Sequence, residues 1–321
     1  MKKNLYLSLL ILILLPPSFL PASGNSTEFE SWITNKHFFP DQSHIEKAKK
    51  YRYFFVTGFM NEILKGGLSE YFYDNIKELS HRGIPESNLY RPIYLSSSRT
   101  AEENAEDLYK IILEQAPGDQ KDLVLIGHSM GAQELFLMSL KQRDFIKNRV
   151  RAVFLIQGSI GGSPIADYVA GEAGEGTLDK LSLWERWRFQ FLMRSGSALR
   201  MVVQEGLHSL TRKNAKSFWS HIQLSDEDRQ LLNLHLFYIL SKMGPDKISD
   251  NPIFSISGRY TLLNFGENDG LLLVEDQMTS RFGTQLALLT ADHCDLVLSL
   301  NPMTRQMRKG LMRAMIQWVG K

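Results

Sequence analysis

An abrupt change of pattern at residues 123–132 constrains the fold of this chain more than any other feature. Four apolar residues, 123–126, predict a buried strand, and apolar side chains at helical spacing follow over residues 132–140. Between them stands Gly-His-Ser-Met-Gly at residues 127–131. Glycine two places before and two places after the serine permits a tight strand-to-helix turn, because a larger side chain would collide with the neighbouring strand or helix. We therefore predict that this turn presents Ser129 as a nucleophile.

A serine becomes a good nucleophile only beside a histidine base that an acid orients, and this layout places them in the order serine, acid, histidine. Residues 259–265 predict an apolar strand that ends before Asp269, and residues 285–290 predict the next strand, which leads to His293. The interval of about 24 residues leaves room for a helix between parallel neighbours. We predict that Asp269 is the acid and His293 the base.

Other acids and histidines fit this order less well. Glu267 lies before the turn that holds Asp269, and Asp276 falls in a predicted helix. Asp269 itself could be an ordinary turn residue. His128 is the direct neighbour of the serine, so its side chain should point away from it, which favours a role in shaping the site. The other histidines precede the serine or lie in a segment with a helical pattern: His37, His44, His81, His208, His221 and His235.

A reaction at an acyl carbon also needs N–H groups that stabilise the oxyanion. One usually comes from the residue after the nucleophile and the other from the loop after an early strand. Here the residue after the serine is Met130. The early strand is predicted at residues 53–56, and the loop that follows it contains Thr57, Gly58 and Phe59. We predict that the backbone N–H groups of Phe59 and Met130 form the oxyanion hole.

The chain resembles the true lipases of bacteria, within the α/β-hydrolase superfamily, from about residue 53 to the C-terminal helix. Four stretches carry the resemblance: Thr-Gly-Phe at 57–59, the serine motif at 127–131, Gly-Ser-Pro-Ile-Ala-Asp-Tyr-Val at 162–169, and Asn-Asp-Gly-Leu at 268–271 followed by Asp-His-Cys-Asp at 292–295. The resemblance implies an α/β-hydrolase fold, a mostly parallel central sheet flanked by helices. It also implies the same serine, acid, base and oxyanion amides.

The comparison with this family raises two further questions, one about the oxyanion loop and one about a calcium site. The family usually has His-Gly where this chain has Thr57-Gly58, which leaves the organisation of the oxyanion loop open. Some of these lipases hold a structural calcium partly through an aspartate two residues after the catalytic histidine, which corresponds to Asp295. Calcium needs several oxygen ligands, and Asp246 or Asp250 could supply a second. The alternative is that Asp295 caps a turn or a helix. No cofactor is expected for the chemistry itself.

Strands and helices alternate along most of the chain, which predicts parallel strands in a doubly wound sheet. The expected strands are 53–56, 89–95, 123–126 and 150–156, and the expected helices are 68–79, 101–113 and one after the serine. Between about 177 and 245 we predict a helical insertion that forms a cap or lid. Its first part interleaves apolar and basic residues: Trp184, Trp187, Phe189, Phe191, Leu192 and Met193 with Arg186, Arg188 and Arg194. Such a helix could cover the serine and contact lipid, or simply pack on the core.

The N-terminus has the pattern of a secretory signal peptide over residues 1–24. Two lysines precede an apolar run that is too short to span a bilayer comfortably, and small residues follow it. We expect residues 25–321 to form a single catalytic domain that is secreted or periplasmic, with an uncleaved membrane anchor as the alternative. Without the leader, 35 basic residues face 35 acidic ones, so no basic field for nucleic acid remains. The only cysteine, Cys294, excludes an intramolecular disulfide.

These observations together predict a secreted serine carboxylic-ester hydrolase that works through an acyl-enzyme intermediate. The resemblance implies acylglycerols or similar lipid esters as substrates, with contact to a lipid-water interface as a further expectation. One alternative is an acyltransferase or thioesterase with the same three residues. A second alternative, from another class, is a non-catalytic α/β-hydrolase scaffold that binds lipid or protein.

Overall fold

The computed structural model describes residues 25–59, 70–200, 204–244, 251–298 and 301–321. The predicted signal peptide lies outside these ranges. The described strands form one sheet in the order β1-β2-β3-β4-β5, and every neighbouring pair is parallel. The strands are β1 (Arg52–Val56), β2 (Leu123–His128), β3 (Val150–Ile156), β4 (Leu236–Lys242) and β5 (Thr284–Thr290). The predicted parallel sheet flanked by helices is therefore confirmed.

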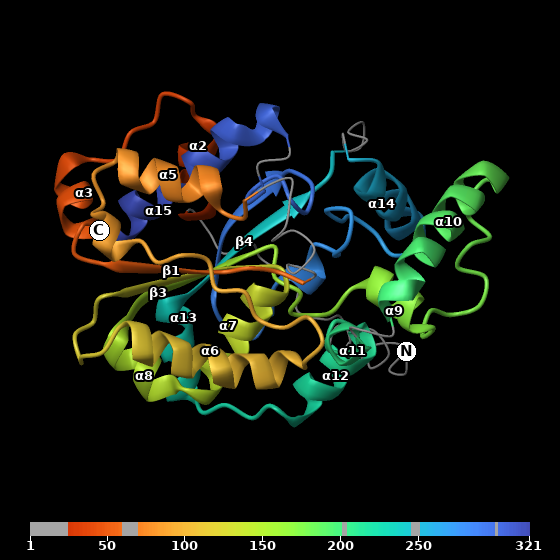
Figure 1. The fold of residues 1–321 in the computed structure, drawn as a ribbon, viewed down its shortest axis with the longest axis horizontal. Coiled ribbons are helices and arrows are strands. Elements are labelled where there is room, and N and C mark those ends of the chain that lie inside the picture. Colours follow the sequence, from red (N-terminus) through yellow and green to blue (C-terminus); the bar gives the residue numbers. More distant parts are fainter. Residues whose placement is uncertain (1–24, 60–69, 201–203, 245–250, 299–300) are drawn as a thin grey trace, which may run out of the picture.

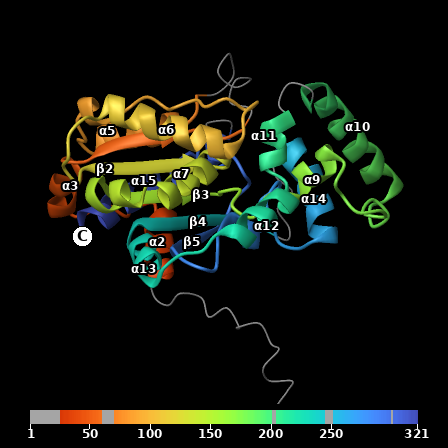
Figure 2. The ribbon, with the colours of Figure 1, turned by 90° about the horizontal axis from the view of Figure 1, so that it is seen from below.

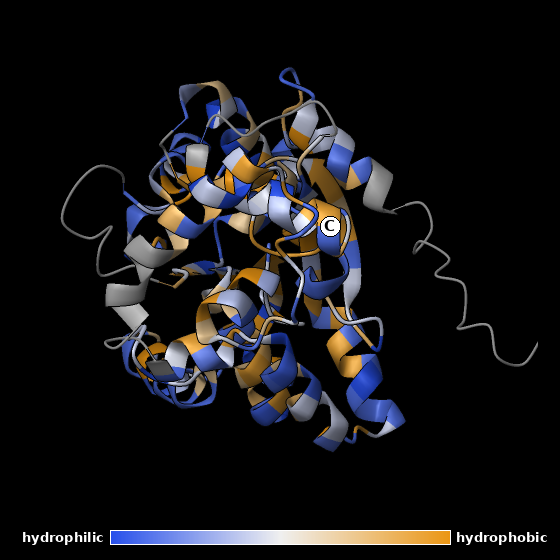
Figure 3. Cartoon of the chain, turned by 90° about the vertical axis from the view of Figure 1, so that its right-hand side faces the viewer, coloured by the Kyte–Doolittle hydropathy of each residue, from blue (hydrophilic) through white to orange (hydrophobic). Residues whose placement is uncertain are grey.

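Two groups of helices cover the two faces of the sheet (Figure 1). One face carries α2 (Asn25–Thr34), α3 (Gln42–Ala48), α5 (Tyr73–His81) and α15 (Arg305–Gly320). The other carries α6 (Ala101–Gln115), α7 (Met130–Lys141), α8 (Arg143–Arg149) and α13 (Asp226–His235). Short 3₁₀ turns lie at Glu86–Asn88 (η1), Glu275–Gln277 (η2) and Pro302–Thr304 (η3). The covering helices mix hydrophilic and hydrophobic residues (Figure 3), as expected when one face packs on a core.

Strand residues alternate between two hydrophobic cores, because successive side chains of a strand point to opposite faces. In β2, Leu123 and Leu125 belong to the core under α6, α7 and α8. Val124 and Ile126 belong to the core under α2, α5 and α15. All of β2 is buried, so the sheet gives the serine turn at its carboxyl end a rigid base.

Five further helices lie together at one end of the molecule (Figures 1 and 2), and we call them the cap. They are α9 (Pro164–Ala170), α10 (Leu183–Arg200), α11 (Gln204–Ser209), α12 (Arg212–His221) and α14 (Pro252–Asn264). Helix α9 contacts the four others. A small apolar cluster of its own, Ile165, Leu181, Phe189 and Tyr260, joins α9, α10 and α14. The cap thus comes from two stretches of the chain, one after β3 and one after β4.

Three secondary-structure predictions from the sequence differ from the structure. The insertion placed at 177–245 contains β4, which pairs with β3 and β5, and α9 of the cap begins earlier. The apolar run at 259–265 forms the end of helix α14, since Asn251 caps that helix and proline occupies its first turn. The run at 89–95 makes only isolated bridges to β1 at Leu89 and Ile93. It contains Pro92, which has no N–H to donate to a ladder.

The predicted strands at 53–56, 150–156 and 285–290 are confirmed as β1, β3 and β5, and the helix predicted at 101–113 is confirmed as α6. Of the helix predicted at 68–79, residues 68 and 69 lie outside the described residues, and the helix α5 begins at Tyr73. Among the helices of the described ranges, none has both the length and the apolar character needed to cross a membrane.

Candidate active site

Ser129 lies in the tight turn between β2 and α7, with backbone angles φ 55° and ψ −122°. This positive φ is unusual for a residue with a side chain and marks a strained turn. A Cβ added at Gly127 would lie 2.6 Å from the Gly131 carbonyl oxygen, and one added at Gly131 would lie 2.6 Å from the Val56 carbonyl oxygen. The close approach of backbone at both places agrees with the requirement for glycine inferred from the sequence.

The structure brings Ser129, His293 and Asp269 into one row of hydrogen bonds. Ser129 Oγ lies 2.9 Å from His293 Nε2, and His293 Nδ1 lies 2.8 Å from Asp269 Oδ2. All three side chains are buried. A carboxylate only accepts hydrogen bonds, so Nδ1 carries the ring proton of a neutral His293 and Nε2 keeps its lone pair toward the serine. This is the tautomer that a general base needs.

Asp269 is held by its own loop as well as by the imidazole. Its Oδ1 accepts hydrogen bonds from the N–H groups of Leu271 (3.0 Å) and Leu272 (2.9 Å), and its carbonyl accepts the His293 N–H at 2.8 Å. Asn268 stands beside the end of β4, where its carbonyl accepts the Met243 N–H at 2.8 Å. The acid therefore follows β4 in space, after the chain has passed through α14 of the cap.

Residues of the cap also form hydrogen bonds with the loop that holds Asp269. Ser163, which caps the N-terminus of α9, donates through Oγ to the Leu271 carbonyl at 2.7 Å. Ser257 of α14 donates to the Gly270 carbonyl at 2.6 Å, and Asn268 donates to the Gly258 carbonyl at 3.2 Å. Two cap helices thus fix the backbone on both sides of Asp269.

The loop after β1 passes directly over the serine. A Cβ at Gly58 would lie 2.9 Å from Ser129 Cβ, so only glycine fits there. Thr57, at the position where the lipases usually have histidine, donates through both its N–H and its Oγ1 to the Ile93 carbonyl, each at 3.1 Å. Phe59 follows in this loop, and Met130 is the first residue of α7, where a backbone N–H has no acceptor within the helix. Both predicted oxyanion donors therefore lie in segments that adjoin Ser129.

His128 points away from the serine, as predicted, and contacts two buried residues that the sequence analysis did not single out. Its Nδ1 lies 2.7 Å from the Tyr71 hydroxyl, and its Nε2 lies 3.2 Å from Gln157 Oε1 and 2.7 Å from the His293 carbonyl. Burial lowers the pKa of His128 well below its usual value, so this imidazole is neutral. No motif in the sequence marked Tyr71 or Gln157, because their partners come from distant strands.

The predicted calcium ligand Asp295 is engaged in its own turn. Its Oδ2 accepts the Asp292 N–H at 3.0 Å, while Asp292 Oδ1 accepts the N–H groups of Cys294 and Asp295 at 2.9 and 3.0 Å. Asp246 and Asp250 fall outside the described residues. Across the described ranges, no group of three or more His, Cys, Asp or Glu side chains is arranged to hold a metal. Within the described residues, the Asp295 carboxylate thus takes part in the hydrogen bonds of the turn at 292–295, and the calcium site stays a prediction.

The surroundings of Cys294, the neighbour of His293, disfavour its thiolate form. Burial and then the charges of Asp292, Asp269 and Asp295 raise the pKa of its thiol well above the usual value. Only the thiolate attacks an acyl carbon efficiently, so a raised pKa disfavours Cys294 as a nucleophile.

Comparison with known proteins gave matches among solved structures alone. No family model matches the chain, and no curated protein matches it. The structure is similar to a metagenomic carboxyl esterase, MGS0156, with a TM-score of 0.59 and 19% identity over 84% of this chain and 76% of that one. It also matches Bacillus licheniformis lipase BlEst2 in its mature form, with a TM-score of 0.48 and 19% identity over 79% of this chain and 86% of that one.

At identities this low, a structural similarity shows the fold and not the reaction. The match to the carboxyl esterase covers most of both chains, and this chain has the parallel sheet and the flanking helices described above. The chain therefore has the α/β-hydrolase fold.

Proposed function

We propose that this protein is a serine carboxylic-ester hydrolase. The observation that carries the proposal is the unbroken row Ser129–His293–Asp269, with contacts of 2.9 and 2.8 Å, at the strained turn after β2. Residues 164 positions apart meet there in the order and tautomer that acyl transfer requires. A scaffold that only binds its ligand has no need for this arrangement.

The proposed reaction has two halves. In the first, His293 Nε2 takes the proton of Ser129 as Oγ attacks the ester carbonyl, and Asp269 stabilises the resulting imidazolium. The N–H groups of Phe59 and Met130 stabilise the oxyanion of the tetrahedral intermediate, and His293 then protonates the departing alcohol. In the second half, His293 activates a water that hydrolyses the acyl-enzyme and releases the carboxylic acid.

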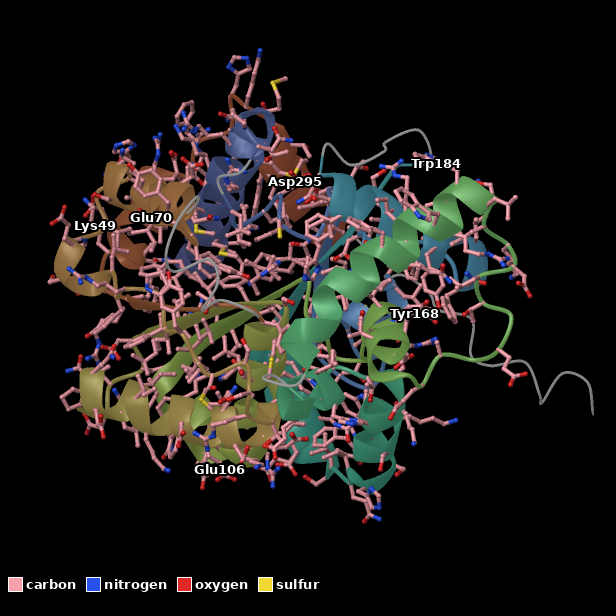
Figure 4. All side chains as sticks on the ribbon, turned by 45° about the vertical axis from the view of Figure 1, so that its right-hand side comes forward. Lys49, Glu70, Glu106, Tyr168, Trp184 and Asp295 are labelled. Atoms are coloured by element: carbon pink, nitrogen blue, oxygen red, sulfur yellow. The ribbon has the colours of Figure 1, made fainter. Side chains whose placement is uncertain are left out.

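We further propose lipid esters as the substrate class, because of the outer face of α10. Three aromatic residues there are largely exposed: Trp184 (64%), Trp187 (55%) and Phe191 (64%). Their rings stack in a row, with centroids 5.1 and 5.8 Å apart, and Figure 4 shows Trp184 near the outer end of the helix. Exposed aromatic rows of this kind favour insertion at the boundary between water and lipid.

The opposite face of α10 accounts for its packing. Phe189 is buried against Tyr260 of α14, with ring centroids 4.3 Å apart and planes within 18°. The packing of α10 on α14 therefore involves Phe189, while Trp184, Trp187 and Phe191 remain largely exposed to solvent. The helix also carries Arg188, a basic residue that suits anionic lipid headgroups, whereas Arg186 pairs with Asp179 at 3.0 Å.

A fluorophosphonate probe, which reacts with activated serines, tests the proposed chemistry. We expect the probe to label the wild type and Ser220→Ala, which alters an exposed serine on α12, but not Ser129→Ala. Absence of labelling in the wild type would overturn the proposal in favour of the non-catalytic scaffold.

The substrate class needs a separate measurement with p-nitrophenyl esters from acetate to palmitate. We expect turnover of the long-chain esters, and we expect replacement of both Trp184 and Trp187 by serine to lower activity on emulsified esters but not on p-nitrophenyl acetate. Turnover restricted to acetate and butyrate would instead identify an esterase for soluble substrates.

A further inference from the structure

Three buried residues from separate elements meet beneath the proposed catalytic row. Tyr71 precedes α5, His128 ends β2, and Gln157 follows β3. The Tyr71 hydroxyl lies 3.1 Å from the Gly58 nitrogen and 2.7 Å from His128 Nδ1. His128 Nε2 lies 2.7 Å from the His293 carbonyl. One continuous path therefore connects the oxyanion loop to the backbone of the base.

The direction of every hydrogen bond in this path follows from its partners. The His293 carbonyl can only accept, so His128 Nε2 carries the ring proton. Because the buried imidazole is neutral, Nδ1 has a free lone pair and accepts the Tyr71 O–H. The Tyr71 oxygen in turn accepts the Gly58 N–H, and burial raises the pKa of this phenol well above its usual value, which keeps the proton on it.

Gln157 fixes the orientation of the same assembly. Its amide nitrogen donates to the Asp292 carbonyl at 2.8 Å and to Ser241 Oγ, so its Oε1 must face His128. The backbone carbonyls of Asp292 and His293 thus both receive side-chain hydrogen bonds from the ends of β2 and β3. The segment that carries the base is held at two consecutive peptide groups.

We propose that Tyr71 and His128 are positioning residues that tie the oxyanion loop to the backbone of His293. This inference rests on the proposed serine hydrolase function. The two segments leave the sheet at opposite edges, from β1 and β5, and both must keep their alignment to Ser129 through the reaction. A chain of buried hydrogen bonds through the residue next to the serine ties them in a fixed geometry.

Residues with an unusual positive φ lie in or next to the assembly of Tyr71, His128 and Gln157. Among the described residues, those other than glycine with a positive φ are Phe72 (59°), Ser129 (55°) and Gln157 (47°). Phe72 follows Tyr71, Ser129 follows His128, and Gln157 belongs to the assembly itself. Such backbone conformations persist only where surrounding contacts impose them, and they cluster at functional sites.

Tyr71→Phe tests the proposal, since it removes a single hydroxyl. The matched control is Tyr53→Phe, which removes another fully buried phenol hydroxyl, bonded to the Ala48 carbonyl at 3.0 Å at the far end of β1. We expect Tyr71→Phe to lower kcat for p-nitrophenyl butyrate by about 10- to 100-fold, with KM within about twofold, because small misplacements of catalytic groups cost this much. Tyr53→Phe should leave kcat unchanged.

His128→Gln provides a second variant, which also serves if Tyr71→Phe does not fold. A glutamine amide can still donate to the His293 carbonyl, but it offers Tyr71 no acceptor at the place of Nδ1. We expect a loss in kcat similar to that of Tyr71→Phe. The double variant should lose little more than either single one, because the same link is already broken.

Active-site titration with the fluorophosphonate corrects each kcat for the folded fraction. A kcat for Tyr71→Phe or His128→Gln equal to that of Tyr53→Phe, with an active wild type, would overturn the positioning role and leave the hydrolase proposal intact. Fully additive losses in the double variant would also overturn it. A wild type that neither reacts with the probe nor hydrolyses the ester would refute both proposals.

Discussion

Replacement of Asp269 by asparagine should invert the tautomer of His293. Asp269 Oδ1 accepts two backbone N–H groups, at 3.0 and 2.9 Å, so the asparagine must place its carbonyl oxygen there. Its NH₂ group then occupies the place of Oδ2, 2.8 Å from His293 Nδ1. A donor at this place requires Nδ1 to accept, so the ring proton moves to Nε2.

The kinetic cost of that inversion is large. With a proton on Nε2, the imidazole lies 2.9 Å from Ser129 Oγ and cannot take the serine proton. The same substitution in serine proteases is the known example of a wrong tautomer and lowers kcat about 10⁴-fold. That factor corresponds to about 5.5 kcal/mol of transition-state stabilisation. We expect a loss of this order here, with KM nearly unchanged.

Steady-state hydrolysis of p-nitrophenyl butyrate measures the effect, and thermal melting reports whether the variant folds. Asp292→Asn is the matched control, because it removes a carboxylate next to His293 whose Oδ1 accepts the N–H groups of Cys294 and Asp295. We expect this control to retain activity within about tenfold. Equal losses in the two variants, or a loss below tenfold for Asp269→Asn, would refute the tautomer argument.

Three further predictions concern stability. Gly131→Ala should destabilise the protein by about 1–3 kcal/mol or more, measured by urea unfolding, because its Cβ would lie 2.6 Å from a backbone oxygen of β1. Burial raises the pKa of Asp276 to about 7 from 3.8, so the fold favours the protonated form and loses stability as pH rises toward 7. In thermal melts, the stability of Asp276→Asn relative to the wild type should therefore increase by up to about 3 kcal/mol from pH 5 to pH 8. A decrease over this range would contradict the argument. Arg308→Met should cost about 3–5 kcal/mol in the same unfolding assay, since it removes the buried guanidinium that contacts the Asp74 carboxylate at 2.9 Å and leaves the more exposed Arg305 at 3.3 Å, and a loss below 1 kcal/mol would refute this.

The site was easier to predict from the sequence than the elements around it. The serine turn depends on local steric requirements, which leave glycine at fixed positions. The acid and base follow from their order along the chain and from the turns that hold them. Asp269 lies 2.8 Å from His293 in the structure although the segment before it, residues 259–265, is helical and not a strand.

The cap and β4 were harder to predict because their identity depends on distant partners. β4 begins at Leu236, directly after α13 ends at His235, and no glycine or proline separates them. A short apolar run of this kind fits a helix or a strand equally well until its neighbours are known. The contacts of the Tyr71 hydroxyl were equally hard to predict, since its partners lie 13 and 57 residues away and only the fold brings them together.

The hydrogen bonds between residues 268–271 and the helices α9 and α14 have a consequence for redesign. Because Ser163 and Ser257 hold the carbonyls of Leu271 and Gly270, these two helices are part of the frame that keeps the carboxylate in place. Chimeras that aim at new substrates should retain α9 and α14 and exchange α10 alone. Transplanting the whole helical subdomain from another enzyme would disturb the acid, and the resulting protein would lose turnover before any change of selectivity could be observed.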